Sequence, residues 1–525
     1  MHPTRVDLVL RNVKLYTVDA AFEVAGGMAV QDGRIVDVGP GEELMARWAP
    51  ERVVDGGGAC AYPGFIDPHS HLLGYSLKLG MADLVGARSW EEAVDRLRAQ
   101  QRRHPTAWAL GRGWDQNLWP GQAYPTRNLL DQAFPDQPVL LVRVDGHAAI
   151  ANGAALALAG LDERTRVPGG DLLQAAGRLT GVLIDNAIDL ARQFVPQPDR
   201  ATRERALLEA QANCFAAGLT SVCDAGVDLE DALLMDAMHR DGRLKLRVYA
   251  MLNPTEENYA HFLARGPYTT DRMTIRAVKT YADGALGSRG ALLLEPYADD
   301  PGNRGLQLAP FEALDEICRR AAAAGYQVCT HCIGDAGVRL MLGIYARHLE
   351  PGNDARWRIE HAQIVDAADL PAFGARAIIP SVQTTHATSD MKWAAERLGP
   401  RIRTAYRYRE LLEQNGWLPN GSDFPVEDIN PLLGFHAGVV RRDLQGWPEG
   451  GFQMENALSR EQALRGMTIW AARANFEEAG RGSLEVGKWA DFVLLDRDLM
   501  EVPEPELASA RVLATYSAGE QVYGR

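Results

Sequence analysis

Two histidines one residue apart stand at the end of an apolar run early in the chain. The segment reads Tyr62-Pro-Gly-Phe-Ile-Asp-Pro-His69-Ser-His71. In a β-strand, residues i and i+2 point to the same side, so the two imidazoles could bind one metal ion. The carboxyl end of a barrel strand is where such a site would lie. An isolated His-x-His is more often a pair of ordinary polar residues, so the metal interpretation depends on matching ligands elsewhere.

Matching ligands do recur, each at the end of a predicted strand. They are Lys279, His331, His361 and Asp423. Taken singly, each has a simpler explanation: a hydrogen-bonded core histidine, a solvated or ion-paired lysine, or an aspartate that caps a helix. Their common position predicts that they converge on one face of a barrel, where they could share a metal site.

The elements that would position these residues alternate between strand and helix. The predicted strands span residues 61–67, 219–223, 246–251, 275–280, 327–330, 357–360, 377–382 and 416–421. Most are followed by a helical pattern, and the pattern at 311–325 is amphipathic with a glycine at its end. Eight such units over residues 61–479 predict an α/β fold, a (β/α)8 TIM barrel with its active site at the carboxyl ends of the strands.

The two ends of the chain have a different character. Residues 1–60 and 480–525 read as short strands with turn signals, including Asp32-Gly33, a strong hairpin signal. They predict one small β-sandwich domain built from both termini. Between the first barrel strand and residue 219 lie roughly 150 residues, far more than an ordinary loop. We expect an inserted subdomain at 85–205, with strands at 107–110 and 139–144 and helices at 90–103 and 148–159, that shapes the active site.

The composition argues against several classes of function. The 525 residues carry a formal net charge of -14, which disfavours binding to nucleic acid or to an anionic membrane. We find no run long and apolar enough to span a bilayer, and no apolar core of signal-peptide length at the start. The six cysteines are sparse and scattered, which favours a reducing cytoplasm over a disulfide scaffold.

The ordered set of His-x-His, lysine, two single histidines and aspartate resembles the amidohydrolase superfamily. Three phrases look like its YtcJ-like branch (amidohydrolase family 3), which includes N-substituted formamide deformylases. These are Pro63-Gly-Phe-Ile-Asp-Pro-His-Ser-His, Lys279-Thr-Tyr-Ala-Asp-Gly-Ala-Leu-Gly-Ser-Arg289 and Gly421-Ser-Asp-Phe-Pro. Gly487-Lys-Trp-Ala-Asp491-Phe-Val is similar to the superfamily's C-terminal strand signature, so the resemblance runs nearly from end to end.

The resemblance implies a pair of zinc ions, although other divalent metals would fit the same ligands. His69 and His71 would bind one ion, and His331 and His361 the other. Lys279, carboxylated by CO2, would bridge the two; otherwise it is a plain cation beside a single metal. Asp423 would bind metal and act as the proton shuttle. The expected reaction is hydrolysis of a C–N bond in an amide, formamide or cyclic amide: metal-activated hydroxide attacks the carbonyl, and the proton passes to the leaving amine.

The resemblance also places a second group of residues near the substrate. They are Trp114, Asp115, Arg143, His147, Arg289, Gln383 and His386. An arginine in a dry pocket would favour a substrate that carries a carboxylate, because guanidinium and carboxylate pair through two hydrogen bonds. The alternative is that Arg143 and Arg289 are structural ion-pair members and that Trp114 belongs to the core.

Two other functions remain to be weighed. A deaminase of aminated heterocycles from the same superfamily typically uses one metal, lacks the bridging lysine and carries a His-x-x-Glu phrase. Here the phrase is His361-Ala-Gln-Ile and Lys279 is present, so deamination is disfavoured. A non-catalytic, metal-free scaffold is disfavoured because inert relatives usually lose ligands and this chain keeps every one. The expected partner is a small amide-like substrate, and the resemblance also suggests a homodimer.

Overall fold

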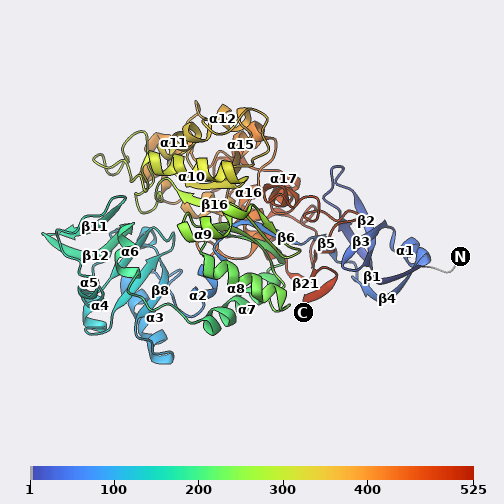
Figure 1. Cartoon of the computed structure of the whole chain (residues 1–525), viewed down its shortest axis with the longest axis horizontal. Helices are drawn as coiled ribbons and strands as arrows, with labels where there is room; N and C mark the ends of the chain where they lie inside the picture. The colour runs from blue at the N-terminus through green and yellow to red at the C-terminus, as the bar shows by residue number, and fades with distance from the viewer. Residues whose placement is uncertain (1–3, 525) are drawn as a thin grey trace.

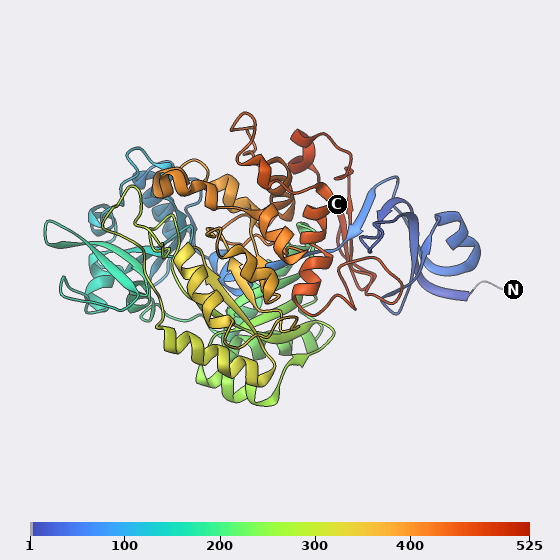
Figure 2. The same ribbon diagram turned by 90° about the horizontal axis from the view of Figure 1, so that it is seen from above.

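Three β-sheets lie side by side along the molecule (Figure 1). The computed structural model describes residues 4–524. A sheet built from both ends of the chain lies at one end of the molecule, the barrel in the middle and an inserted sheet at the other end. The same order is visible from above (Figure 2). The barrel therefore has the terminal sheet on one side and the inserted sheet on the other.

The central sheet has seven strands, and all neighbours in it are parallel. In spatial order they are β19 (Ile379–Ser381), β18 (Arg358–His361), β17 (Gln327–Cys332), β16 (Met273–Tyr281), β14 (Arg247–Leu252), β13 (Leu219–Val227) and β6 (Phe65–Ser70). The short β15 (Tyr268–Thr269) pairs with β16 from outside this order. Almost every residue of these strands is buried, which is typical of a parallel sheet covered by helices on its outer face.

The eighth barrel position was predicted as a strand at 416–421, and this prediction is wrong in detail. Val382 and Asn420 form only an isolated parallel bridge. Pro419 has no N–H to donate, and the N–H of Asn420 bonds to Gly466 instead, so a regular ladder cannot form. The segment still closes the barrel, because Gly421 N donates to Val382 O at 2.9 Å and Asp423 N donates to His69 O at 2.8 Å. The (β/α)8 prediction is confirmed.

Helices cover the outside of the barrel and its carboxyl face. They are α2 (Leu72–Lys78), α7 (Arg200–Ala216), α8 (Leu229–Arg240), α9 (Glu256–His261), α10 (Phe311–Ala324), α11 (Asp335–Tyr345), α12 (Leu370–Ala375), α13 (Thr384–Asp390), α14 (Ala394–Leu398), α15 (Tyr408–Asn415), α16 (Pro431–Val440), α17 (Arg460–Gly466) and α18 (Ile469–Ala474). The predicted helix at 311–325 is confirmed as α10, which ends where Gly325 adopts the left-handed conformation at φ 72°.

The terminal sheet combines strands from both ends of the chain. Its strands are β1 (Thr4–Tyr16), β2 (Val24–Gln31), β3 (Arg34–Gly39), β4 (Trp48–Asp55), β5 (Cys60–Pro63), β20 (Phe492–Leu495), β21 (Val512–Ser517) and β22 (Glu520–Gly524), with α1 (Gly41–Arg47) beside them. The single strand predicted at 61–67 is split: β5 joins this sheet, between β1 and β20, and β6 joins the barrel. The buried Arg247 of β14 donates to Asp491 at 2.7 Å, which ties the C-terminal signature to the barrel.

The inserted sheet has six strands and its own small helices. The strands are β7 (Ala82–Asp83), β8 (Ala109–Trp114), β9 (Val139–Arg143), β10 (Ala148–Ala151), β11 (Gly170–Ala175) and β12 (Arg178–Asp185); the helices are α3 (Trp90–Arg103), α4 (Asn128–Ala133), α5 (Gly153–Leu158) and α6 (Ala187–Arg192). The helix predicted at 148–159 is wrong in its first half, because Ala148–Ala151 pairs with β9 and β12 as β10. Sheet pairing overrides the helix propensity of alanine there.

Two further findings concern the chain as a whole. Among the described residues, no helix is both long and apolar enough to cross a membrane. All six cysteines are buried free thiols, including Cys329 and Cys332, which lie on β17.

Candidate metal centre

Five imidazole rings form a continuous row at the carboxyl ends of the barrel strands. The ring centroids are 5.7 Å apart between His71 and His69, and 4.9 Å apart between His69 and His361. They are 4.5 Å apart between His361 and His331, and 4.7 Å apart between His331 and His147. His69, His361 and His331 lie on β6, β18 and β17, and His71 directly follows β6, as the sequence predicts for strand-end ligands. The fifth comes from the inserted subdomain.

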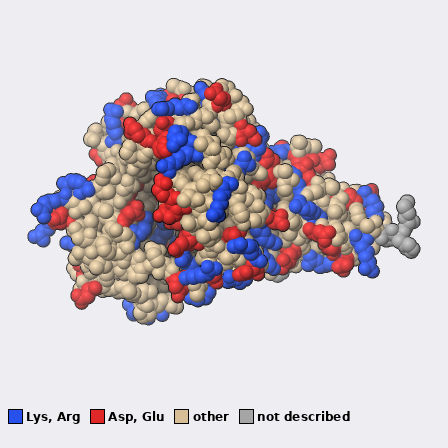
Figure 3. Space-filling model, in the orientation of Figure 1, with Lys and Arg blue, Asp and Glu red and all other residues tan. Residues whose placement is uncertain are grey.

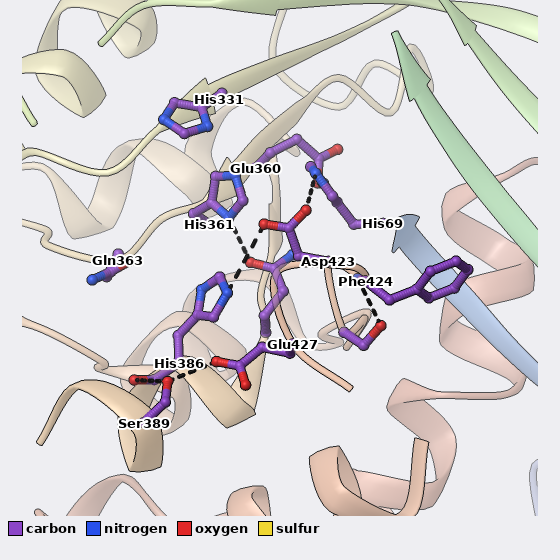
Figure 4. A network of polar contacts seen from close by, with 12 residues as sticks. His69, His331, Glu360, His361, Gln363, His386, Ser389, Asp423, Phe424 and Glu427 are labelled. Atoms are coloured by element: carbon purple, nitrogen blue, oxygen red, sulfur yellow. Dashed lines mark hydrogen bonds and ion pairs between the residues drawn. The ribbon is translucent and has the colours of Figure 1, made fainter. Parts of the chain in front are cut away.

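Asp423 lies at one end of this row. Its Oδ1 is 3.1 Å from Nε2 of His71 and 3.5 Å from Nε2 of His69. Its Oδ2 is 3.9 Å from Nε2 of His386, on α13. Ligand atoms of His69, His71 and Asp423 all lie within 4.8 Å of one another, close enough to hold one metal ion. Figure 4 shows His69, His361 and His386 around this carboxylate.

The hydrogen bonds of His69 and His71 decide which ring nitrogen is free. His71 Nδ1 lies 2.9 Å from the backbone oxygen of Ala225, and His69 Nδ1 lies 2.5 Å from Oε2 of Glu360. Both partners are acceptors, so each Nδ1 carries the proton and each Nε2 keeps a lone pair. Oδ1 of Asp423 is buried and forms no hydrogen bond. With neutral rings, the lone pairs of these three groups face one another, an arrangement that a proton or a bound cation relieves, and the set of ligand types fits a divalent metal.

The other two strand-end histidines are also prepared as neutral ligands. His361 Nδ1 lies 2.7 Å from Oε1 of Gln383, and His331 Nε2 lies 3.3 Å from the backbone oxygen of Gly284. In each ring the remaining nitrogen is left with a lone pair. Burial, followed by the charges of neighbouring groups, holds the pKa of His331 and of His361 well below the ordinary value. Neutral imidazoles are the form that binds metal.

Lys279 lies under the row, on β16. The side chain is fully buried, and Nζ is 3.2 Å from Nε2 of His69 and 4.9 Å from the centre of the Tyr281 ring. Among the described residues, no carboxylate forms a salt bridge with it. Burying an ammonium without a carboxylate partner costs free energy. A covalent modification of Lys279 or a bound anion nearby would remove that cost.

The loop that carries Asp423 is held by Asp67 of β6. The Asp67 carboxylate accepts from Ser422 Oγ at 2.6 Å and from His69 N at 3.0 Å, and burial raises its pKa to about 7. Asp423 itself adopts φ 61°, a left-handed conformation that aims its side chain at the imidazoles. Burial alone would raise the pKa of Asp423, but His69 and His71 outweigh burial and hold that pKa well below its ordinary value.

A cavity of about 430 Å³ opens above the row, between the barrel loops and the inserted sheet. Figure 3 shows a hollow between the inserted lobe and the central body, with acidic side chains along its edge. The predicted site residues that line the cavity are Asp115, Arg143, His147, His331, His361, His386 and Asp423. The barrel and the insertion therefore both contribute to the wall.

Arg143 lines the cavity but is not free to bind a substrate carboxylate. Its guanidinium, which is almost fully buried, donates to Asp115, to Asp145 at 2.5 Å and to Gln116 Oε1 at 2.8 Å. The acidic side chains Asp83, Asp145, Asp390, Glu427 and Asp428 also line the cavity. Arg143 therefore gives no support to the expectation of a carboxylate-bearing substrate.

Three predicted substrate-binding residues are not brought to the cavity wall. Trp114 is buried in the core of the inserted sheet, where its Nε1 donates to Leu141 O at 2.8 Å. Arg289 pairs with Asp299 at 2.8 Å, and Gln383 lies behind His361 as its hydrogen-bond partner. In the structure Trp114 is therefore a core residue and Arg289 is a member of an ion pair.

Two carboxylates that matter here escaped the sequence reasoning. Glu360 directly precedes His361 on β18, so its side chain points to the opposite side of the strand, where it meets His69. Burial would raise the pKa of Glu360, but His69 and Arg358 outweigh it and lower that pKa to about 2. Asp185 ends β12 and meets His147, which is distant in sequence. The phrase Glu360-His361 was a usable signal; Asp185 had none.

Comparisons with known proteins agree with this architecture. The chain matches the amidohydrolase family over residues 52–523, and a bacterial imidazolonepropionase-like composite domain over residues 26–49. It is 33% identical to Protein LONG AFTER FAR-RED 3 of Arabidopsis thaliana over 98% of this chain and 91% of that protein. It is 31% identical to YtcJ of Bacillus subtilis, covering 97% and 98% of the two chains, and 28% identical to N-substituted formamide deformylase of Arthrobacter pascens, covering 99% and 98%.

A solved structure extends the comparison to the fold. An uncharacterized metal-dependent hydrolase from Pyrococcus horikoshii is 29% identical, with a TM-score of 0.76 over 95% of this chain and 99% of that one. The family match spans the barrel, the insertion and the C-terminal strands. The resemblance read from the sequence is confirmed: this chain belongs to the amidohydrolase family and is a metal-dependent hydrolase.

Proposed function

We propose that this protein hydrolyses a C–N bond, other than a peptide bond, in an amide, formamide or cyclic amide. The observation that carries the proposal is the convergence of three ligands, His69, His71 and Asp423, whose free lone pairs face one another. A relative along nearly the whole chain is named N-substituted formamide deformylase, which supports this class of bond.

The residues present suit two divalent ions, which we propose to be zinc. His69 and His71 would hold one, His331 and His361 the other, and Asp423 would contribute to the first. When bound, such an ion polarises a carbonyl and lowers the pKa of a water molecule to about 7. Neutral histidines and a carboxylate are the ligand types that zinc prefers.

We propose that Lys279 is carboxylated, a form in which it would be a ligand shared by the two ions. As an ammonium it is buried without a carboxylate, and it points at the lone pair of His69 that a metal would need. Reaction with CO2 replaces a positive charge by a negative one and supplies two oxygen ligands. The ring of Tyr281 offers only partial compensation for the unmodified cation.

Asp423 is proposed as the proton shuttle. Its low pKa keeps the carboxylate ionised near neutral pH, so it can accept a proton from the attacking water. The oxygen of that water bonds to the carbonyl carbon. Asp423 then returns the proton to the nitrogen of the leaving amine as the C–N bond breaks, which gives a carboxylic acid and an amine. His386 Nε2 lies 3.9 Å from Oδ2 of Asp423, beyond hydrogen-bond distance.

The proposed setting is the cytoplasm, with a small amide-like substrate and neither nucleic acid nor membrane as a partner. Six buried cysteines without a disulfide suit a reducing compartment.

Metal content tests the proposal first. Elemental mass spectrometry on the wild type, with bicarbonate in the buffer, should give about two divalent ions per chain. Lys279→Ala should lower this number, and the matched control Lys392→Ala, which changes a lysine paired with Asp443 at 3.1 Å outside the centre, should not. Formamides, linear amides and cyclic amides are then screened for turnover. One ion that is independent of Lys279, together with release of ammonia from aminated heterocycles, would instead indicate a deaminase.

A further inference from the structure

The row of imidazoles has a polar group at each end. Asp423 lies at the His71 end, and His147 lies at the other end, beside His331. Both line the same cavity. A substrate lying over the row, with its reacting carbon near the ligands, would therefore have Asp423 on one side and His147 on the other.

His147 is held rigidly by a second residue of the inserted sheet. Its Nδ1 lies 2.6 Å from Oδ1 of Asp185, whose side chain is fully buried. The two residues are also joined through the backbone, where Asp185 N donates to His147 O at 3.0 Å. Because Nδ1–H donates its hydrogen bond to the Asp185 carboxylate, Nε2 is the ring nitrogen left to contact a ligand. Among the described residues, none forms a hydrogen bond with that Nε2.

Two glycines of a barrel loop leave room for the pair of His147 and Asp185. A β-carbon added at Gly284 or Gly290 would lie 2.5 Å or 2.4 Å from Oδ2 of Asp185. Both glycines belong to the loop that follows Lys279, and the close approach explains why no larger residue fits there. Asp185 also adopts φ 49°, so the end of β12 is bent to put the carboxylate behind His147. The two glycines and the left-handed backbone of Asp185 thus all make room for the contact between Asp185 and His147.

We propose that His147 is a substrate-binding residue that the insertion supplies to the active site, and that Asp185 is its positioning residue. The inference deepens the proposed function and rests on it. His147 Nε2 forms a hydrogen bond with a polar group of the amide substrate at the end opposite Asp423. The inserted sheet thereby selects substrates that carry a hydrogen-bonding group at the position of His147 when the scissile bond lies over the metal ligands.

Steady-state kinetics on the metal-loaded enzyme test the pair. His147→Ala should raise KM about tenfold for the best amide substrate, with metal content and melting temperature close to those of the wild type. His147→Gln, which keeps a polar group, should recover part of the loss. Asp185→Asn should have a smaller effect than Asp185→Ala, because an amide oxygen can still accept from Nδ1.

A second histidine–aspartate pair provides the control. His348 Nε2 lies 2.8 Å from Asp315 Oδ1, outside the cavity and with similar exposure of the histidine. His348→Ala should leave KM unchanged. Equal KM for wild type and His147→Ala would overturn the inference, as would loss of metal in His147→Ala, because the residue would then be a ligand. If His147→Ala does not fold, the Asp185 variants decide in the same way.

Binding of benzohydroxamate, a metal-directed inhibitor, separates this inference from the proposed function. Calorimetric titration should show about tenfold weaker binding to His147→Ala than to the wild type and the His348→Ala control. If that difference is found but no amide is turned over, the proposed function fails and the substrate-binding role of His147 stands. Equal binding overturns the role of His147 whatever bond is cut. Absence of both turnover and binding in the metal-loaded wild type overturns both.

Discussion

Glu360 Oε2 lies 2.5 Å from Nδ1 of His69, and both side chains are fully inaccessible to solvent. A carboxylate behind a metal-binding histidine fixes the ring orientation and makes the opposite nitrogen a better ligand. Arg358 lies 3.8 Å from the other oxygen of Glu360, so the negative charge is balanced. The orientation of His69 on β6 is therefore set by Glu360 of β18, a strand that is not a neighbour of β6 in the sheet.

Replacement of Glu360 tests this arrangement. Glu360→Gln removes the charge but keeps the shape, and we expect metal affinity to fall about 10- to 100-fold. Competition with a chelator of known affinity measures the change, with Glu410→Gln as the control, since Glu410 is a partly exposed residue of α15 that pairs with Arg407 outside the centre. Unchanged metal affinity would mean that the Glu360 carboxylate contributes to packing in the core and not to metal binding.

Asp423→Asn should lower kcat by about a hundredfold to ten-thousandfold, because an amide cannot take the proton that the carboxylate takes. Asp428→Asn is the matched control, since Asp428 lines the same cavity but is exposed. Stopped turnover assays give kcat, and elemental analysis shows whether metal is retained. Wild-type turnover in the metal-loaded Asp423→Asn variant would exclude this residue as the base.

Gly421→Ala should disturb the join between β6 and the eighth barrel segment. A β-carbon there would lie 2.6 Å from Asp67 Oδ1 and 2.9 Å from His69 N. We expect a loss of stability of about 1–3 kcal/mol and weaker metal binding. Gly343→Ala in α11, where a β-carbon meets nothing within 4 Å, should instead stabilise by about 0.5–1 kcal/mol. Differential scanning calorimetry and chelator competition report the two effects.

Stability should fall in acid partly through His239, which lies outside the metal centre. Burial lowers the pKa of this residue to about 4, its Nε2 lies 2.9 Å from Leu246 O, and its buried Nδ1 has no partner for a second proton. Between pH 6.5 and 4 the unfolded chain binds a proton at this site that the folded chain does not. Folding therefore loses up to about 3 kcal/mol as the pH falls through that window.

His239→Gln keeps a donor for Leu246 O but does not titrate. Denaturant unfolding at pH 7 and at pH 4.5 should show a smaller loss for this variant than for the wild type. The same loss in both proteins would show that other groups control the acid dependence.

The barrel was predictable because its strands are short apolar runs and its ligands stand at their ends. The eighth segment was not, because Pro419 has no N–H to donate and the N–H of Asn420 bonds to Gly466 O, a partner that no local pattern records. The strand β10 escaped for the related reason that an alanine-rich sequence carries a helix preference and the sheet decides otherwise.

The candidate site, like the fold, was predictable only in part. Metal-ligand types are visible in a sequence because few residues bind metals, and the expected set meets at one end of the barrel. Partners such as Asp185 are ordinary aspartates until the chain folds and brings them to a histidine. The opposite error arose at Arg143, where a residue type suggested anion binding but three local acceptors already use its donors.

The position of β5 has a consequence for how the protein is made. This strand lies between β1 and β20, and the residues between Pro63 and Phe492 must be synthesised before the second neighbour exists. At ribosomal rates, roughly 430 residues take on the order of 20 to 90 seconds. During that interval one edge of the nascent sheet has no partner strand and could pair with another chain. Pairing of β20 closes that edge, so a strand that is translated late protects strands that are translated early.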